Sequence, residues 1–91
     1  MEPSYRASPE VILTELRDGT GVLLHLGTKF YYDINATGVA AWSALSAQTG
    51  TTRQVLAERL AQRFRVDRDT VRRDLEPVLR EMLVEGLVTS D

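Results

Sequence analysis

Cysteine is absent from the sequence, and histidine occurs once, as His25. Without cysteine the chain has no disulfide scaffold, no thiolate metal site and no cysteine nucleophile. One histidine does not make a metal cluster, and no carboxylate lies at a useful helical spacing from it. We therefore expect no metal and no cofactor, and we expect His25 to be a structural or half-exposed strand residue.

The motifs of the common enzyme classes are also missing. There is no G-x-S-x-G nucleophile motif, no H-E-x-x-H zinc motif, no phosphate-binding glycine loop with G-K-[ST] and no dinucleotide fingerprint. Gly19, Gly21 and Gly27 fall in predicted hairpin turns, where a positive φ explains them. The neighbouring acids Asp67 and Asp69 begin a predicted helix, where the macrodipole favours negative charge. We therefore expect that the chain is not an enzyme.

Long apolar segments are lacking as well. Runs such as Gly21–Leu26 are far too short to cross a bilayer. The first ten residues hold no basic region followed by an apolar stretch, so we read no signal peptide and expect a cytoplasmic protein without a membrane partner. Hydrophobic residues make up 43% of the chain, which is typical of a globular domain. We expect a flexible arm over residues 1–9 and one domain over residues 10–91.

Charge is distributed unevenly along the chain. The formal net charge is −2, and lysine occurs once, as Lys29. Residues 53–80 nevertheless carry more arginines than acids, and such a basic patch suits phosphates, acidic peptide side chains or an acidic protein partner. For any single arginine, a place on a solvated helix face with mixed salt bridges is a better explanation than a place in a binding patch. The arginines are Arg53, Arg59, Arg63, Arg65, Arg68, Arg72, Arg73 and Arg80, and the acids are Glu58, Asp67, Asp69, Asp74 and Glu76.

The first half of the chain has the pattern of a three-stranded antiparallel meander. Asp18-Gly19 is a hairpin signal, and Gly27-Thr28 is a second tight turn. Such a sheet needs helices over one face. The predicted strands are Val11–Leu16, Val22–Leu26 and Lys29–Ile34. The third strand would direct one set of side chains to each face, with Phe30, Tyr32 and Ile34 on one and Lys29, Tyr31 and Asp33 on the other.

The second half is predicted to form three helices, which gives an α+β chain of order βββααα. Asn35 would cap the first helix, Thr51 with Gln54 offers a capping box for the second, and Asp67 would cap the third. Gly86 would end the third helix. The predicted ranges are Ala36–Ala47, residues 52–64, and Asp67 to about Glu85.

Pro77 interrupts the last predicted helix. A proline removes one backbone donor and crowds the carbonyl of Arg73, at a cost of ~3 kcal/mol in an unadjusted helix interior. We expect a kink there, or two helical pieces that meet near Glu76. The apolar face of this helix would comprise Val71, Leu75, Val78, Leu79 and Met82.

The sequence resembles the pyrroloquinoline-quinone biosynthesis chaperone family. The resemblance is carried by the pattern y-x-L-N-x-x-[GA]-x-x-[IV]-W-x-x-L, in which Tyr32, Asn35, Gly38 and Trp42 stand at matching positions. Ala41 departs from the bulkier aliphatic residue that is common there. Weaker similarity continues through the last two helices, so it covers residues 11–88.

This resemblance implies a winged helix-turn-helix-like domain that recognises ribosomally synthesised, modified peptides. In such domains the leader of the precursor adds as a strand to the third strand, next to the last helix. The chain is similar in size to stand-alone copies in lasso-peptide pathways, which implies a separate leader peptidase as partner, with a cyclase as a further candidate. We expect a monomer or weak dimer.

The residues themselves favour the same mechanism. An edge strand has unpaired N–H and C=O groups that can pair with an extended peptide, and one helix face could form the other wall of a groove. Arg72 and Arg73 could reach acidic leader residues, and Asp74 a basic one. For each apolar residue taken singly, a role in the core is more common than a contact with a ligand. The candidate peptide-binding residues are Lys29, Phe30, Tyr31, Tyr32, Asp33, Ile34, Val71, Arg72, Asp74, Leu75, Val78 and Met82.

Two rival functions remain open at this point. A winged helix with arginines on its last two helices could bind DNA, but a pI of about 5.3 and interleaved acids argue against a nucleic-acid partner. An accessory subunit that docks on a larger protein without a peptide ligand is the other rival.

Overall fold

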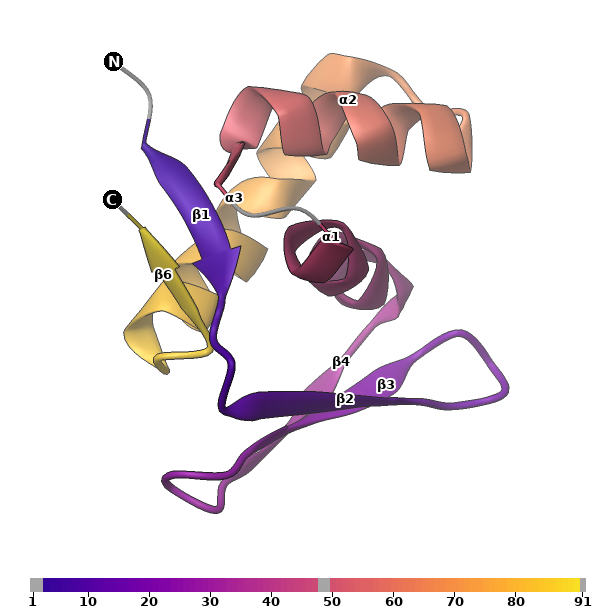
Figure 1. Cartoon of the computed structure of the whole chain (residues 1–91). Coiled ribbons are helices and arrows are strands. Elements are labelled where there is room, and N and C mark those ends of the chain that lie inside the picture. The colour runs from indigo at the N-terminus through magenta and orange to yellow at the C-terminus, as the bar shows by residue number, and fades with distance from the viewer. Residues whose placement is uncertain (1–2, 48–49, 91) are drawn as a thin grey trace.

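The computed structural model describes residues 3–47 and 50–90, and it confirms a three-stranded antiparallel meander followed by three helices (Figure 1). Strands β2 (Val11–Glu15), β3 (Gly21–His25) and β4 (Tyr31–Ile34) form one sheet in the order β2-β3-β4. Asp18 closes the first turn by accepting hydrogen bonds from the Thr20 backbone N–H at 3.0 Å and hydroxyl at 2.6 Å. Gly19 supplies the positive φ of 90° that this turn requires.

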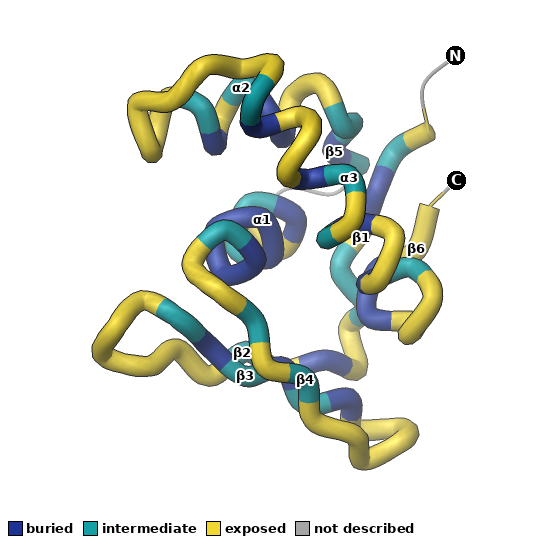
Figure 2. The backbone as a smooth tube through the Cα atoms, turned by 180° about the vertical axis from the view of Figure 1, so that it is seen from behind, coloured by how far each residue is buried: buried dark blue, intermediate teal, exposed yellow. Residues whose placement is uncertain are grey.

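Helix α1 (Ala36–Ala47) lies between the meander and α2 (Figures 1 and 2). It carries no charged residue, and much of its surface is buried, which suits a helix covered on several sides. Trp42 and Leu45 belong to the central core together with Leu23 of β3 and Leu56 of α2 (Arg53–Phe64). Asn35 caps α1 as predicted, because its Oδ1 accepts a hydrogen bond from the Gly38 N–H at 2.8 Å.

Helix α3 (Arg68–Val84) begins and ends as predicted. The Asp67 carboxylate accepts from the N–H groups of Asp69 and Thr70. Gly86 has a φ of 73°, and the Leu87 N–H donates to the Met82 carbonyl at 2.8 Å. This glycine-dependent end turns the chain back, so that Leu87 is buried in the core.

The second helix begins one residue later than predicted. Thr52 is the cap, since its hydroxyl accepts from the Val55 N–H at 3.2 Å. Thr51 lies in the short strand β5 (Thr51–Thr52) instead, so the capping box of Thr51 with Gln54 is wrong.

Pro77 lies inside one continuous helix, so the expectation of two helical pieces is wrong. Its side chain is exposed to solvent, while Leu75 and Leu79 on either side are buried. Packing of the apolar face therefore keeps α3 together across the missing backbone donor.

The N-terminal segment contradicts the prediction of a flexible arm at Ser4–Ala7. These residues form strand β1, which pairs on one side with β5 and on the other with β6 (Val88–Ser90). Tyr5 is only 3% exposed and its hydroxyl accepts a hydrogen bond from Arg53 Nη2 at 3.0 Å. The strand was missed because its pairing partners lie near residues 51 and 89, beyond the reach of any local pattern.

The third strand of the meander is shorter than predicted. Lys29 adopts a left-handed backbone conformation with φ 68° and belongs to the turn, as does Phe30. Phe30 is 62% exposed, so it is not half-buried as Tyr32 and Ile34 are. Nδ1 of His25 accepts hydrogen bonds from the N–H groups of Gly27 and Thr28, at 3.1 and 3.3 Å. The single histidine is therefore a buried residue at the end of β3 that supports the following turn, in agreement with the structural strand role expected for it.

Candidate functional site

Strand β4 is an edge of the meander, and no other strand of residues 3–47 and 50–90 pairs with its outer side. The His25 N–H donates to the Phe30 carbonyl at 3.0 Å, which fixes the alternation of the ladder with β3. In an antiparallel pair, every second residue directs both of its backbone groups to the partner strand. Tyr32 and Ile34 therefore face β3, while Tyr31 and Asp33 direct their N–H and C=O groups outward.

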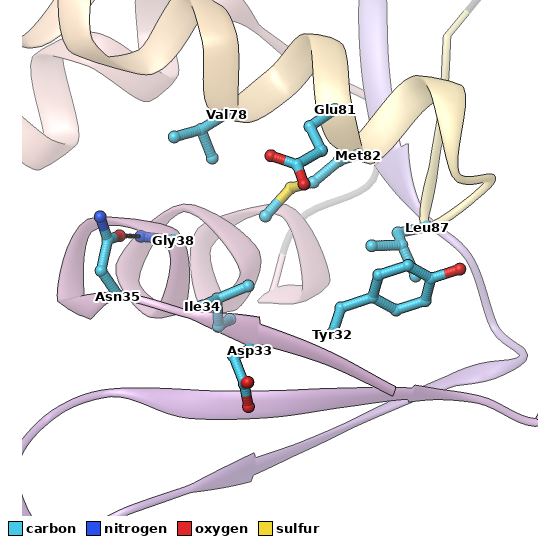
Figure 3. A pocket seen from close by; sticks show the side chains of 9 residues that line it. All are labelled: Tyr32, Asp33, Ile34, Asn35, Gly38, Val78, Glu81, Met82 and Leu87. Atoms are coloured by element: carbon cyan, nitrogen blue, oxygen red, sulfur yellow. Dashed lines mark hydrogen bonds between the residues drawn. The ribbon is translucent and has the colours of Figure 1, made fainter. Parts of the chain in front are cut away.

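A groove runs between β4 and α3 and contains a cavity of about 120 Å³. Figure 3 shows Val78 and Met82 of α3 on one side and Ile34 and Tyr32 of β4 on the other, with Leu87 at one end. These side chains give the cavity an apolar interior. The residues that line it are Tyr32, Asp33, Ile34, Asn35, Gly38, Val78, Glu81, Met82 and Leu87.

Two features of local sequence keep this cavity open. Gly38 lies in the first turn of α1, and a Cβ atom added there would lie 3.0 Å from Ile34 Cβ, so a side chain would crowd the cavity. The turn at Gly86 brings Leu87 back beneath Met82 and so forms the end of the groove. The groove thus depends on one missing side chain and one left-handed turn.

A hydrogen bond crosses the groove at the end near Tyr32. The Tyr32 hydroxyl donates to Glu85 Oε2 at 3.0 Å. Desolvation, and then the Glu85 carboxylate, raise the pKa of the Tyr32 phenol above its ordinary value. The phenol therefore keeps its proton and remains a donor to Glu85 at neutral pH.

The side chains around the groove are acidic where they are charged. Glu81 lines the cavity, and in Figure 3 its carboxylate points from α3 toward β4. The Asp33 side chain points to the other face of the sheet in the same view, so Asp33 borders the cavity through its backbone. Among the described lining residues none is lysine or arginine.

The structure separates the predicted site residues into three groups. Tyr32, Asp33, Ile34, Val78 and Met82 lie together around the cavity.

The second group consists of Val71 and Leu75. Both belong to the core, and Leu75 is 0% exposed. The third group lies outside the cavity on the surface, and it comprises Lys29, Phe30, Tyr31, Arg72 and Asp74. Of these, Tyr31 lies on the open edge and is 72% exposed.

Sequence reasoning did not select four residues that line the cavity, Asn35, Gly38, Glu81 and Leu87. Asn35 and Gly38 were recognised for other reasons, as a helix cap and as part of a family pattern. Glu81 lies three residues after Val78, a spacing that places both on one helix face. That spacing was a usable signal, whereas the contribution of Leu87 depends on the three-dimensional turn at Gly86.

Several arginines of the 53–80 segment take part in ion pairs on the helices. Arg53 contacts Glu76 at 2.9 Å, and Arg68 contacts Glu58 at 3.3 Å. Arg80 also approaches Glu76, at 3.9 Å. These contacts fit helix faces with mixed salt bridges better than one basic patch.

Two further features bear on the class of site. Within the described part of the chain, no three His, Cys, Asp or Glu side chains are grouped so as to hold a metal ion. None of the described helices is long and apolar enough to span a membrane.

Together, the fold and the groove define an α+β domain with an open strand edge beside an apolar pocket. The chain belongs to the family of coenzyme PQQ synthesis protein D (PqqD), which residues 20–88 match, and this confirms the resemblance. It is similar to TbiB1 in complex with the TbiA(beta) leader peptide, at 32% identity over 91% of this chain and 93% of that chain, with a TM-score of 0.73.

A second solved structure, a lasso peptide synthetase B1 complexed with the leader peptide, shares the fold. It is 22% identical, covers 94% of this chain and 98% of its own, and has a TM-score of 0.72. A comparison with curated proteins gave no match.

Proposed function

We propose that this chain binds the leader segment of a ribosomally synthesised precursor peptide as an added strand on β4, beside α3. It performs no chemistry and presents the bound peptide to separate maturation enzymes, a leader peptidase and a cyclase of lasso-peptide type. The observation that carries the proposal is the open β4 edge next to an apolar pocket. The similar TbiB1 structure contains a leader peptide, which supports the same class of ligand here.

The backbone of β4 supplies the first half of the recognition. Tyr31 and Asp33 offer two N–H donors and two C=O acceptors at the edge, and an extended peptide can satisfy all four. Each hydrogen bond contributes about 0.5–1.5 kcal/mol net. Because these groups belong to the backbone, they fix the register of a peptide without selecting its sequence.

The pocket supplies the second half, which is selective. Side chains of an added strand alternate, so every second one would point toward α3. The cavity of about 120 Å³ is comparable to an apolar cavity of roughly 150 Å³ that accommodates benzene. One aliphatic side chain of the leader therefore fits between Ile34, Val78 and Met82.

The direct test is titration of a fluorescein-labelled leader into the protein, followed by anisotropy. The TbiA(beta) leader, which the similar TbiB1 structure contains, is the probe, and a scrambled peptide of the same composition is the control. We expect saturable binding of a leader and no saturation by the scrambled peptide. No change in anisotropy up to high micromolar protein would contradict the proposal and favour an accessory subunit without a peptide ligand.

Amide hydrogen exchange locates the bound strand. Addition of the leader should slow exchange at Tyr31 and Asp33, whose N–H groups face outward, and leave Tyr32 and Ile34 nearly unchanged. Protection confined to other elements would place the peptide elsewhere.

A further inference from the structure

We infer that the groove selects a leader with a basic side chain two residues from its apolar anchor, and that Glu81 is the residue that reads it. This inference rests on the proposed function, because it names the chemistry of the peptide that the β4 groove accepts. It differs from the sequence-based expectation, in which Arg72 and Arg73 meet acidic leader residues.

The first observation is the charge pattern of the helix wall. Val78, Glu81 and Glu85 lie three and four residues apart, so they follow one another along one face of α3. Val78 and Glu81 line the cavity, and Glu85 is fixed at the end of the groove by the Tyr32 hydroxyl. An added strand would therefore lie against one apolar residue followed by two carboxylates.

The second observation is that the Glu81 charge is not compensated within the fold. Glu76, on the same helix, approaches Arg53 and Arg80, and Glu58 on α2 pairs with Arg68. Among the residues that the structure describes, Glu81 has no such ion pair. The fold thus neutralises glutamates on other helix faces and leaves this one free at the groove.

The direction of β4 sets the spacing between anchor and basic residue. Ile34 lies in the cavity with Val78, while Tyr32 reaches Glu85, so β4 and α3 run side by side in opposite directions (Figure 3). Inward side chains of an added strand are about 6.6–6.8 Å apart. Glu81 is about 4.5 Å and Glu85 about 10.5 Å from Val78 along the helix axis. The next inward side chain after the anchor therefore falls between the two carboxylates.

The energetic reason for selectivity is the loss of water around Glu81 when a peptide covers it. A neutral side chain opposite Glu81 would leave a partly dehydrated carboxylate without a partner, and an acidic one would add repulsion. A lysine or arginine restores the lost interaction. Because Glu81 is exposed before binding, we expect a discrimination of roughly threefold to tenfold rather than several orders of magnitude.

The experiment uses three labelled versions of the leader that are identical except at the position two residues from the anchor, which is lysine, glutamine or glutamate. They are titrated into wild type, Glu81→Gln and Glu81→Lys, and into Glu15→Gln as the control. Glu15 is an exposed glutamate on β2, so its substitution makes the same change in net charge away from the groove. Thermal melting of each variant confirms that it is folded.

In wild type and Glu15→Gln, we expect the lysine peptide to bind roughly threefold to tenfold more tightly than the glutamine peptide, with the glutamate peptide weakest. The preference should shrink to within about twofold in Glu81→Gln and reverse in Glu81→Lys, and it should weaken as salt is raised. Equal binding of the three peptides to wild type, or a preference unchanged in Glu81→Gln, would overturn the inference but not strand addition at β4. Failure of all three peptides to bind wild type would instead contradict the proposed function itself.

Discussion

The meander has two edges. Within the described residues, the β4 edge adjoins an apolar pocket, whereas the hollow beside the β2 edge is more open and more polar. Along β4, Tyr31 and Asp33 direct their backbone groups outward next to the cavity that Val78 and Met82 line. Along β2, the Leu26 N–H donates to Glu10 O, so by the same alternation the outward residues are Val11, Leu13 and Glu15.

One of the outward backbone groups of β2 is already hydrogen-bonded within the chain. The Val11 N–H donates to the Ser8 carbonyl at 3.2 Å, within the turn that leads from β1 into β2. A larger hollow of about 450 Å³ lies beside Val11 and Trp42, and its walls include Arg6, Ser8 and Ser46. Open backbone groups therefore occur at both edges, and the proposal of β4 as the peptide site rests on the apolar pocket beside it, which could hold alternate side chains of an added strand.

The largest expected effect is on stability, and it tests whether Leu75 belongs to the core or to the wall of the β4 groove. Leu75 is completely buried one turn before Val78, so Leu75→Ala should lower the free energy of unfolding by about 2–5 kcal/mol. Val84→Ala, at a 77% exposed position of the same helix, should change it by less than about 0.5 kcal/mol. Chemical denaturation measures both. If Leu75→Ala reduced peptide affinity while leaving stability intact, Leu75 would be a wall of the groove after all.

The second largest effect should be a loss of leader affinity when the pocket beside β4 is filled. Val78→Phe places extra volume into the cavity beside β4, and we expect at least a tenfold loss of leader affinity, equivalent to about 1.4 kcal/mol. Val84→Phe adds the same side chain outside the cavity and should bind like wild type. Isothermal titration calorimetry measures the leader affinity of each variant. Equal affinities of the two variants would contradict a role of the pocket in leader binding.

Proline at each edge compares the two strands directly. Tyr31→Pro and Glu15→Pro both remove an outward N–H without breaking the ladder to β3. We expect Tyr31→Pro to weaken leader binding about twofold to tenfold, since one backbone hydrogen bond is lost, and Glu15→Pro to have no effect. Weaker binding in Glu15→Pro, with Tyr31→Pro unaffected, would assign the peptide to β2.

The smallest effect is expected at the Tyr32–Glu85 hydrogen bond. The pKa of Tyr32 is raised by desolvation and by Glu85, so the folded state favours the neutral phenol. The contribution of the Tyr32–Glu85 hydrogen bond to stability is therefore fully present below the ordinary pKa of the phenol. It declines as pH rises toward the higher pKa that Tyr32 has in the folded state. Thermal melting of wild type should fall slightly in this alkaline window, and Tyr32→Phe should show less of that fall. Identical alkaline profiles of the two proteins would contradict this linkage.

Much of the fold follows from local sequence. Asp18-Gly19 predicts the first hairpin, Asn35 and Asp67 predict two helix starts, and Gly86 predicts a helix end, because each acts on its immediate neighbours. β1 escapes such reasoning, since Tyr5 is explained only by partners distant in sequence.

The candidate site was predictable in outline and not in detail. Alternation placed Tyr32 and Ile34 on the inward face, but it could not show that Lys29 is left-handed and that the strand begins only at Tyr31. Helical spacing grouped Leu75 with Val78, yet periodicity gives a face and not the boundary between core and groove. That boundary depends on how far α3 lies over β4.

The pairing of β1 with β6 also affects how the domain is made. Tyr5 lies opposite Ser90, so this contact joins segments from nearly opposite ends of the described chain. During synthesis, β2, β3, β4 and α1 can assemble from neighbouring segments, while β1 has no β6 partner until residues 88–90 leave the ribosome. Contacts between distant segments slow folding because a long loop must close first. The N-terminal strand is thus made early and completes its sheet late.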